Sequence, residues 1–295
     1  MRVSYQRWAI VAVAVIAVLG SGALVAYLLR GTPAPVAPAE IVKVTIPDTS
    51  PRHTVIGSSV EGRTIDAYTY GTGGTRLGFV GGMHGGYEWN SILLAYELMD
   101  YLSAHPEIIP GNLSVTIIPD INPDGVYKVL GTTGRFTVAD VPTGADLVPG
   151  RYNADTVDLN RNFACNWQAT STFLGKVTNA GTAAFSEPEA RAIRDFVLAN
   201  NPKAMVFLHS KSGSVYASEC NNGILPKTLE IMKVYARAAG YQAINVFDAY
   251  KITGDAEGWL ASIGIPAITV ELKTHETVEW EQNLAGIKAL FEYYK

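Results

Sequence analysis

Hydrophobic positions fall into one long run at the start of the chain and many short runs after it. Residues 8–29 contain no charged side chain and follow Arg2 and Arg7. A helix needs about 20 apolar residues to cross a bilayer, and flanking arginines stay in the cytoplasm. We therefore expect residues 1–30 to be an N-terminal transmembrane anchor or a signal segment. The run is longer than the apolar part of a signal peptide, about 7–15 residues, and this favours an uncleaved anchor.

The rest of the chain divides into a short linker and one domain. Residues 31–40 are rich in Pro and Ala and carry no charge before Glu40, which is typical of an extended spacer. From residue 41 to residue 295, strand and helix signals alternate without a second linker or an internal repeat. We expect 41–295 to form a single domain outside the cytoplasm.

Four short apolar runs in this domain have the length of buried strands: 77–80, 115–118, 204–208 and 267–270. Helical patterns occupy 90–104, a segment that starts at 186, 226–239 and 281–294. The segment Ser186-Glu187-Pro188-Glu189 matches a capping box at the start of its helix. Strands that alternate with helices predict an α/β fold, with helices on both faces of a mainly parallel sheet.

Composition narrows the classes of function. Apolar residues make up 48% of the chain and aromatic residues 10%, which is enough for a packed core and too much for a disordered polymer. The first 30 residues hold three of the 23 basic side chains and no acid, so the remainder carries 20 basic and 27 acidic groups, a net charge of −7. This balance argues against general nucleic-acid binding.

The chain has two cysteines, Cys165 and Cys220, in the part predicted to lie outside the cytoplasm. Thiols oxidise in that environment, so we expect a disulfide between them. The alternative is two unrelated buried thiols.

Polar residues directly follow the four apolar runs. Ligands of open α/β sheets bind beyond the carboxyl ends of the strands, which makes these positions candidate site residues. They are His84 with Glu88, residues 122–125, His209 with Ser210, and Glu271. Two histidines and one carboxylate are the protein ligands of many catalytic zinc sites, and His84, Glu88 and His209 supply that set. A loop hydrogen bond is the alternative for His84 and Glu88.

Five residues, Glu271 among them, suggest chemistry at a site. Asn160 and Arg161 place an amide beside a guanidinium, which suits a planar carboxylate. Asp158 can accept the second ring N–H of a metal-bound histidine. A carboxylate at Glu271, after a run of Ile and Val, requires a cavity, a cation or a metal. Tyr250 lies in a glycine-containing segment suited to a mobile flap. The alternatives are a surface salt bridge for Arg161, a helix cap for Asp158 and a half-buried tyrosine for Tyr250.

In this order, the residues resemble the zinc carboxypeptidase family of metallopeptidases, the carboxypeptidase A-like family that contains the pancreatic carboxypeptidases. The resemblance spans most of residues 55–280 and rests on the motifs GGMHGGYE, NPDG, RYNADTVDLNRNF, FSEPEARAI, FLHS and TVEL and on the segment from Tyr250 to Trp259. It implies a single α/β/α domain around a mixed eight-stranded sheet, one Zn2+ per chain, and hydrolysis of the C-terminal peptide bond of peptides.

The resemblance also implies a role for each position. It makes His84, Glu88 and His209 the zinc ligands and Glu271 the general base. It implies that Asn160, Arg161 and Tyr250 bind the terminal carboxylate of the substrate and that Arg151 faces the scissile carbonyl. The family usually spaces its first two ligands His-x-x-Glu, whereas Tyr87 makes the spacing one residue longer here. Arg135 is the competing candidate for the role of Arg151.

The family pattern also predicts a specificity pocket. The residue seven positions after Tyr250 is Glu257, with Asp255 nearby, and an acidic floor favours a basic terminal residue or the amine of diaminopimelate in cell-wall peptides. We therefore expect a monomeric zinc metallocarboxypeptidase, anchored in the membrane or secreted, that acts on peptides with a free C-terminal carboxylate and binds no nucleic acid. The alternatives are a murein-peptide hydrolase that acts on diaminopimelate-containing cell-wall peptides, and a non-catalytic binding relative.

Overall fold

The predicted strands lie at the centre of one sheet. The computed structural model describes residues 25, 28, 31 and 50–295, and the sheet belongs to a compact unit, Asp48–Lys295. Within the described residues, this sheet has eight strands in the order β1-β2-β4-β3-β7-β12-β8-β11. Their bounds are β1 Arg52–Ser58, β2 Thr64–Tyr70, β3 Thr75–Val80, β4 Leu113–Ile118, β7 Ala204–Ser210, β8 Ser214–Ala217, β11 Gln242–Ile244 and β12 Ala267–Leu272.

The sheet is mixed, as expected. Strand β3 pairs in parallel with β4 and β7, β7 with β12, and β8 with β11. The pairs β1–β2, β2–β4 and β8–β12 are antiparallel. The neighbours β4, β3, β7 and β12 therefore end at one edge of the sheet, so the residues that follow them come together there. Two small hairpins lie outside the sheet: β5 Thr170–Phe173 with β6 Lys176–Asn179, and β9 Glu219–Cys220 with β10 Gly223–Ile224.

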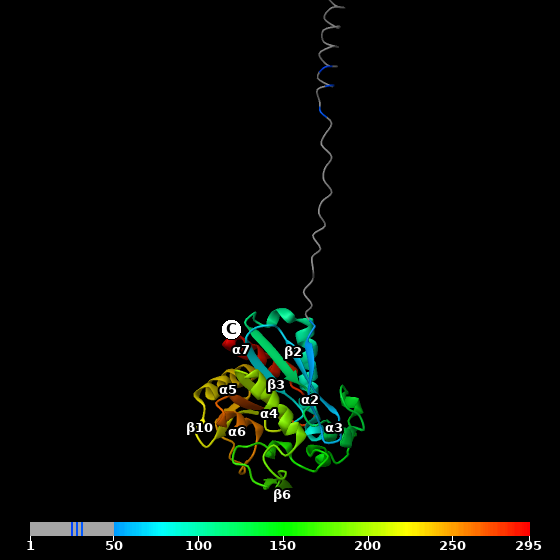
Figure 1. Cartoon of the computed structure of the whole chain (residues 1–295), viewed down its shortest axis with the longest axis vertical. Coiled ribbons are helices and arrows are strands. Elements are labelled where there is room, and N and C mark those ends of the chain that lie inside the picture. The colour runs from blue at the N-terminus through cyan, green and yellow to red at the C-terminus, as the bar shows by residue number, and fades with distance from the viewer. Residues whose placement is uncertain (1–24, 26–27, 29–30, 32–49) are drawn as a thin grey trace, which may run out of the picture. The chain divides into compact units, whose positions relative to one another are not determined.

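Helices cover both faces of the sheet, which confirms the α/β/α arrangement (Figure 1). Their bounds are α2 Trp89–Ala104, α3 Pro123–Leu130, α4 Pro188–Asn200, α5 Pro226–Ala239, α6 Ala256–Ser262 and α7 Trp280–Tyr294. On one face, α2, α5 and α7 bury Leu98, Ile231 and Phe291. On the other face, α4 and α6 bury Ile193 and Leu260. Side chains of β7 alternate between these two cores, as the two-residue repeat of a strand requires.

One helix start differs from its prediction. Helix α5 ends at Gly240 as expected, with a left-handed φ of 69°, but the capping box predicted at 186–189 does not form. Helix α4 begins at Pro188, and Glu187 before it makes no side-chain cap. The Ser186 hydroxyl instead donates to Glu187 and accepts from Asn162, 24 positions away. A hydrogen bond from Asn162 therefore replaces the local capping interaction that the sequence predicts for Ser186.

The predicted membrane segment, 1–30, and the linker, 31–40, lie outside the described residues apart from positions 25, 28 and 31. Among the residues that the structure describes, no helix combines the length and the hydrophobicity needed to span a bilayer.

Candidate active site

A cavity of about 770 Å³ opens where the parallel strands end. The predicted site residues that line it are His84, Glu88, Arg151, Asn160, Arg161, His209, Tyr250, Asp255, Glu257 and Glu271. Asp158 is fully buried behind them. The fold thus collects in one place residues that are up to 187 positions apart in the sequence.

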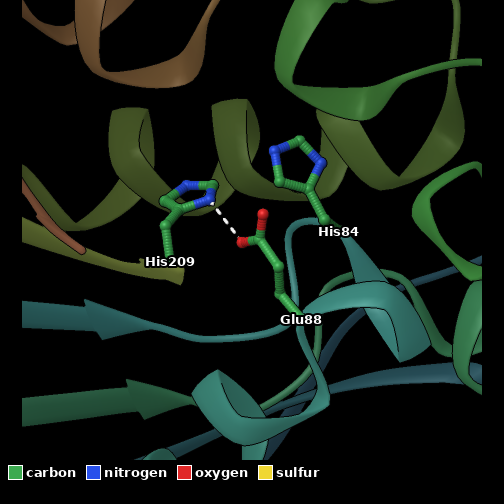
Figure 2. A group of neighbouring side chains, drawn as sticks. All are labelled: His84, Glu88 and His209. Atoms are coloured by element: carbon green, nitrogen blue, oxygen red, sulfur yellow. Dashed lines mark hydrogen bonds and ion pairs between the residues drawn. The ribbon is translucent and has the colours of Figure 1, made fainter. Parts of the chain in front are cut away.

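His84, Glu88 and His209 form the group that can hold a metal ion. One possible ligand atom from each lies within 4.8 Å of the others, and all three side chains are buried. Figure 2 shows them converging from the turn after β3, the start of α2 and the end of β7. The Glu88 carboxylate accepts from His209 Nδ1 at 2.9 Å, while His84 Nδ1 and His209 Nε2 have no hydrogen-bond partner. Two histidines and one carboxylate, all buried and with possible ligand atoms this close together, fit a zinc ion.

A short turn absorbs the extra residue between His84 and Glu88. Residues Gly85–Glu88 form a 3-10 helix, and Glu88 is the residue that leads into α2. Gly85 has a φ of 45°, and a Cβ there would lie 2.7 Å from the Gly150 carbonyl oxygen. A side chain at this position would collide with that carbonyl, so glycine lets the turn tighten and keeps Glu88 beside His209.

The charges around these residues suit a cation. Burial, followed by the positive charge of Arg151, holds the pKa of His84 well below its usual value. Burial also opposes the charge of His209, but Glu88 and Glu257 outweigh it and raise the pKa of His209 well above its usual value. Two carboxylates thus draw a positive charge into a buried site, and a bound metal ion can supply that charge.

Arg151 lies in the cavity and Arg135 does not. Arg151 is buried at the end of a 3-10 helix, Val148–Arg151, and its Nε and Nη2 each lie 2.9 Å from Asp158 Oδ2. Its Nη1 is 3.7 Å from Glu88 Oε1. Arg135 instead forms an exposed ion pair with Asp100, so the competing assignment is not supported. The other oxygen of Asp158 lies 3.5 Å from His84 Nδ1, the position from which it can orient that ring.

The turn after β4 supports Arg151 from behind. Asn122, one of the polar residues predicted at a strand end, is buried and does not line the cavity. Its Oδ1 accepts from Gly125 and caps α3, while its Nδ2 donates to the carbonyl oxygen of Arg151 at 3.3 Å. The residues 122–125 therefore hold the backbone that carries Arg151.

Asn160 and Arg161 sit side by side on a short 3-10 helix, Leu159–Arg161. Asn160 Oδ1 accepts from the backbone of Ala256, the first residue of α6. Arg161 is only 2% exposed, and its Nε has no hydrogen-bond partner. Tyr250 lies at the more open side, with its ring 4.8 Å from that of Phe247. A buried guanidinium with an unused N–H suits a planar anion.

Glu271 stands directly beside His209. The two residues are paired in register on the parallel strands β12 and β7, so their side chains share one face of the sheet. Burial, and then the Glu88 carboxylate, raise the pKa of Glu271 to about 8. Glu271 is therefore a carboxyl group placed to exchange one proton near neutral pH.

Two acids at the start of α6, Asp255 and Glu257, line the cavity at the part that we call the pocket floor. Glu257 is 3% exposed, and its Oε1 accepts from Thr269 Oγ1 at 2.9 Å and lies 3.5 Å from His209 Nε2. Its other oxygen is buried without a partner. Asp255 caps α6 through Gly258 N–H at 2.7 Å, which fixes its orientation. Of the two acids, Glu257 is therefore the one whose carboxylate keeps a fully buried oxygen without a hydrogen bond.

The predicted disulfide between Cys165 and Cys220 is present and lies in the wall of the cavity. It links the segment after Arg161 to strand β9, so the two sides of the pocket are held together covalently. The alternative of two unrelated buried thiols is excluded.

Sequence reasoning missed the aromatic wall of the cavity. Phe173, in strand β5, places its ring 3.7 Å from the Arg151 guanidinium carbon and 5.7 Å from the ring of Tyr87. The ring of His275 also packs against Tyr87, with 4.8 Å between ring centres. The available signal was the extra residue in the His84–Glu88 turn, because that residue is a tyrosine directly beside a candidate metal ligand.

Comparisons with known proteins agree with this geometry. The family model for zinc carboxypeptidases matches residues 45–285. Carboxypeptidase B of Helicoverpa zea is 28% identical over 176 residues, which cover 53% of this chain and 40% of that protein. The solved carboxypeptidase A of Helicoverpa armigera superposes with a TM-score of 0.64 at 22% identity, over 83% of this chain and 67% of that one. The murein-tripeptide amidase MpaA of Escherichia coli O157 gives 0.58 at 20% identity, over 82% and 91%. The chain belongs to the zinc carboxypeptidase family, whose cofactor is zinc.

Proposed function

We propose that this protein is a zinc metallocarboxypeptidase that removes the C-terminal residue of peptides. The observation that carries the proposal is the meeting of His84, Glu88 and His209 in a cavity, with Glu271 paired in register beside His209. The chain spans less than half of the length of the Helicoverpa zea relative, so its activity rests on these residues and not on that match.

His84, Glu88 and His209 would hold the ion. Zinc bound by two histidines and a carboxylate lowers the pKa of a coordinated water to about 7. Asp158 would orient His84 from behind, since it faces the ring at 3.5 Å.

Glu271 would act as the general base. Its carboxyl group takes the proton of the attacking water and later returns it to the leaving amine. Positive charge at the three ligands lowers the pKa of Glu271 below the value of about 8 that burial and Glu88 produce, so the carboxylate form becomes available. Arg151 would donate to the carbonyl oxygen as its negative charge develops, and one such donor is worth roughly 2.7–4 kcal/mol in the barrier.

Arg161 and Asn160 would bind the terminal carboxylate of the substrate, with Tyr250 closing over it. Arg161 Nε is a buried donor without a partner, so a carboxylate satisfies an atom that the protein leaves unpaired. Holding the chain end in this way also sets the scissile bond beside the ligands, which is positional catalysis as much as binding.

Glu257 would select a basic terminal side chain. Its unpaired oxygen is buried at the floor, where an ammonium or guanidinium group can pair with it. The same acid would recognise the amine of diaminopimelate, so a murein-peptide hydrolase is the second candidate. The solved murein-tripeptide amidase has a similar fold, and comparing muropeptides with ordinary Lys-terminal peptides separates the two functions.

The setting we propose is outside the cytoplasm. The disulfide is typical of oxidising compartments, and residues 1–30 are predicted to anchor or export the chain. We expect a monomer that acts on peptide substrates and binds no nucleic acid.

Metal analysis combined with peptide trimming tests the proposal. We expect one zinc per chain and loss of single residues from the C-terminus of a peptide library, abolished by chelation. Glu271→Gln should keep zinc and lose more than nine-tenths of the turnover, while Glu276→Gln, at an exposed position in the following loop, should keep both. A protein without zinc, or cleavage that survives chelation, contradicts the proposal.

A further inference from the structure

A histidine that the proposed mechanism does not use lines the same cavity. His275 lies in the loop between β12 and α7 and is half-buried. Its ring packs against Tyr87, with 4.8 Å between ring centres, and its Nδ1 lies 2.7 Å from Ser210 Oγ. Both partners adjoin a proposed zinc ligand, because Tyr87 precedes Glu88 and Ser210 follows His209.

A chain of hydrogen bonds fixes which nitrogen of His275 carries the hydrogen. Asn90 Nδ2 donates to the carbonyl oxygens of Thr274 and Thr277, at 2.7 and 2.9 Å. Its Oδ1 therefore faces Ser210 Oγ, at 3.0 Å. Because an amide oxygen can only accept, the Ser210 hydroxyl donates its hydrogen bond to Asn90 Oδ1. The Ser210 oxygen is left as an acceptor, so His275 donates to it through Nδ1–H.

This arrangement makes the other ring nitrogen of His275 an acceptor. A neutral imidazole that carries its hydrogen on Nδ1 has a free lone pair on Nε2. Burial lowers the pKa of His275 from its usual value, which favours the neutral ring. The ring is also fixed in place by Tyr87 and Ser210, so the acceptor has one defined position in the cavity wall.

The two ring nitrogens of His209 face different carboxylates. Glu257 is near Nε2 of the His209 ring, at 3.5 Å, whereas Glu88 is near Nδ1, at 2.9 Å. Tyr87 adjoins Glu88 in the chain and packs against His275, so His275 lines the cavity beside the residue that precedes Glu88. With the terminal residue at Glu257, as proposed above, a peptide that runs past His209 and Glu88 would reach His275 with the residues on the amino side of the scissile bond.

We propose that His275 Nε2 accepts a hydrogen bond from a backbone N–H of the substrate on the amino side of the scissile bond. The proposal rests on the carboxypeptidase function. A neutral acceptor matches an N–H that every peptide carries whatever its side chains, so this contact holds the chain without selecting its sequence.

N-methylated peptides test the contact. Three peptides share one sequence: one unmodified, one N-methylated at the residue that precedes the scissile bond, and one methylated at the residue before that. In the wild type, methylation at the N–H that His275 binds should lower kcat/KM. In His275→Phe, which lacks the acceptor, the loss from methylation at that same position should be smaller by about 3- to 10-fold, the range for one neutral hydrogen bond. Phe keeps a ring against Tyr87 but offers no acceptor. The control is His105→Phe, at an exposed position, which should keep the wild-type losses.

Each outcome is decisive. Equal losses in wild type and His275→Phe at both positions overturn this contact and leave the carboxypeptidase function standing. A wild type that cleaves none of the three peptides overturns both. Nitrogen-15 spectra of the wild-type histidines provide a second measurement if His275→Phe does not fold. They should show His275 protonated on Nδ1 and unprotonated on Nε2, and the opposite tautomer refutes the proposal.

Discussion

Replacing Glu257 by Gln removes one charge from the pocket floor and preserves the shape of the side chain. Its Oε1 can still accept from Thr269, as it does at 2.9 Å, so the side chain keeps its position. The change falls on the buried oxygen that has no partner within the protein. A basic substrate side chain that pairs there loses a hydrogen bond to a charged group, worth about 1.5–3 kcal/mol. This corresponds to about a 10- to 150-fold loss of kcat/KM.

The assay compares matched peptides that end in Lys, Arg and Phe. Glu257 also lies 3.5 Å from His209, so part of any loss reflects the zinc site and falls on all three peptides equally. The ratio of Lys to Phe turnover isolates the pocket, and this ratio should fall by the factor given above. Asp255→Asn is the control, because Asp255 already bonds to Gly258 and an Asn can cap α6 in its place. A wild type that prefers Phe, or a Glu257→Gln variant with an unchanged ratio, refutes the assignment.

Three further substitutions test the binding of the terminal carboxylate by Arg161, the disulfide and the buried carboxyl group of Asp120. Arg161→Ala should raise KM for peptides with a free C-terminal carboxylate and leave any cleavage of amidated peptides unchanged. An equal loss of activity on both kinds of peptide would contradict the proposal that Arg161 binds the terminal carboxylate. Cys165→Ser removes the disulfide between two cysteines that lie 55 positions apart. The chain-entropy model predicts that the free energy of unfolding, measured with urea, falls by about 4 kcal/mol. An unchanged free energy of unfolding would contradict a stabilising role of this disulfide. Burial raises the pKa of Asp120 to about 8, so the folded state binds more protons than the unfolded state between about pH 4 and 8. Stability should therefore fall with rising pH across that window, by up to about 1.4 kcal/mol per unit. Asp120→Asn should flatten this slope, and identical slopes would contradict it.

The short-range pattern of the sequence was enough for the elements and for several site residues. Four apolar runs became β3, β4, β7 and β12, and Gly240 ended α5 as expected. Site residues at the carboxyl ends of β3, β7 and β12 do meet at one edge of the sheet, because these strands are parallel neighbours; His209 and Glu271 are the second-to-last residues of β7 and β12. Strand length, helix periodicity and a C-terminal glycine are local properties, so the sequence alone can predict them.

Contacts between distant segments could not be predicted in this way. The capping box at Ser186 failed because Asn162 competes for its hydroxyl. The choice between Arg151 and Arg135 depended on which loop reaches Asp158, and loop paths leave no periodic signal.

The sequence by itself determined the residue types of the site, their order along the chain and the position of His84 and His209, two of the candidate ligands, after an apolar run. Only the tertiary structure decided that a one-residue longer turn still brings Glu88 to His209, that Glu257 keeps an unpaired oxygen, and that His275 joins the cavity wall. The physical reason is that strand ends follow from local apolar patterns, whereas hydrogen-bond partners and burial depend on how segments from different parts of the chain pack together.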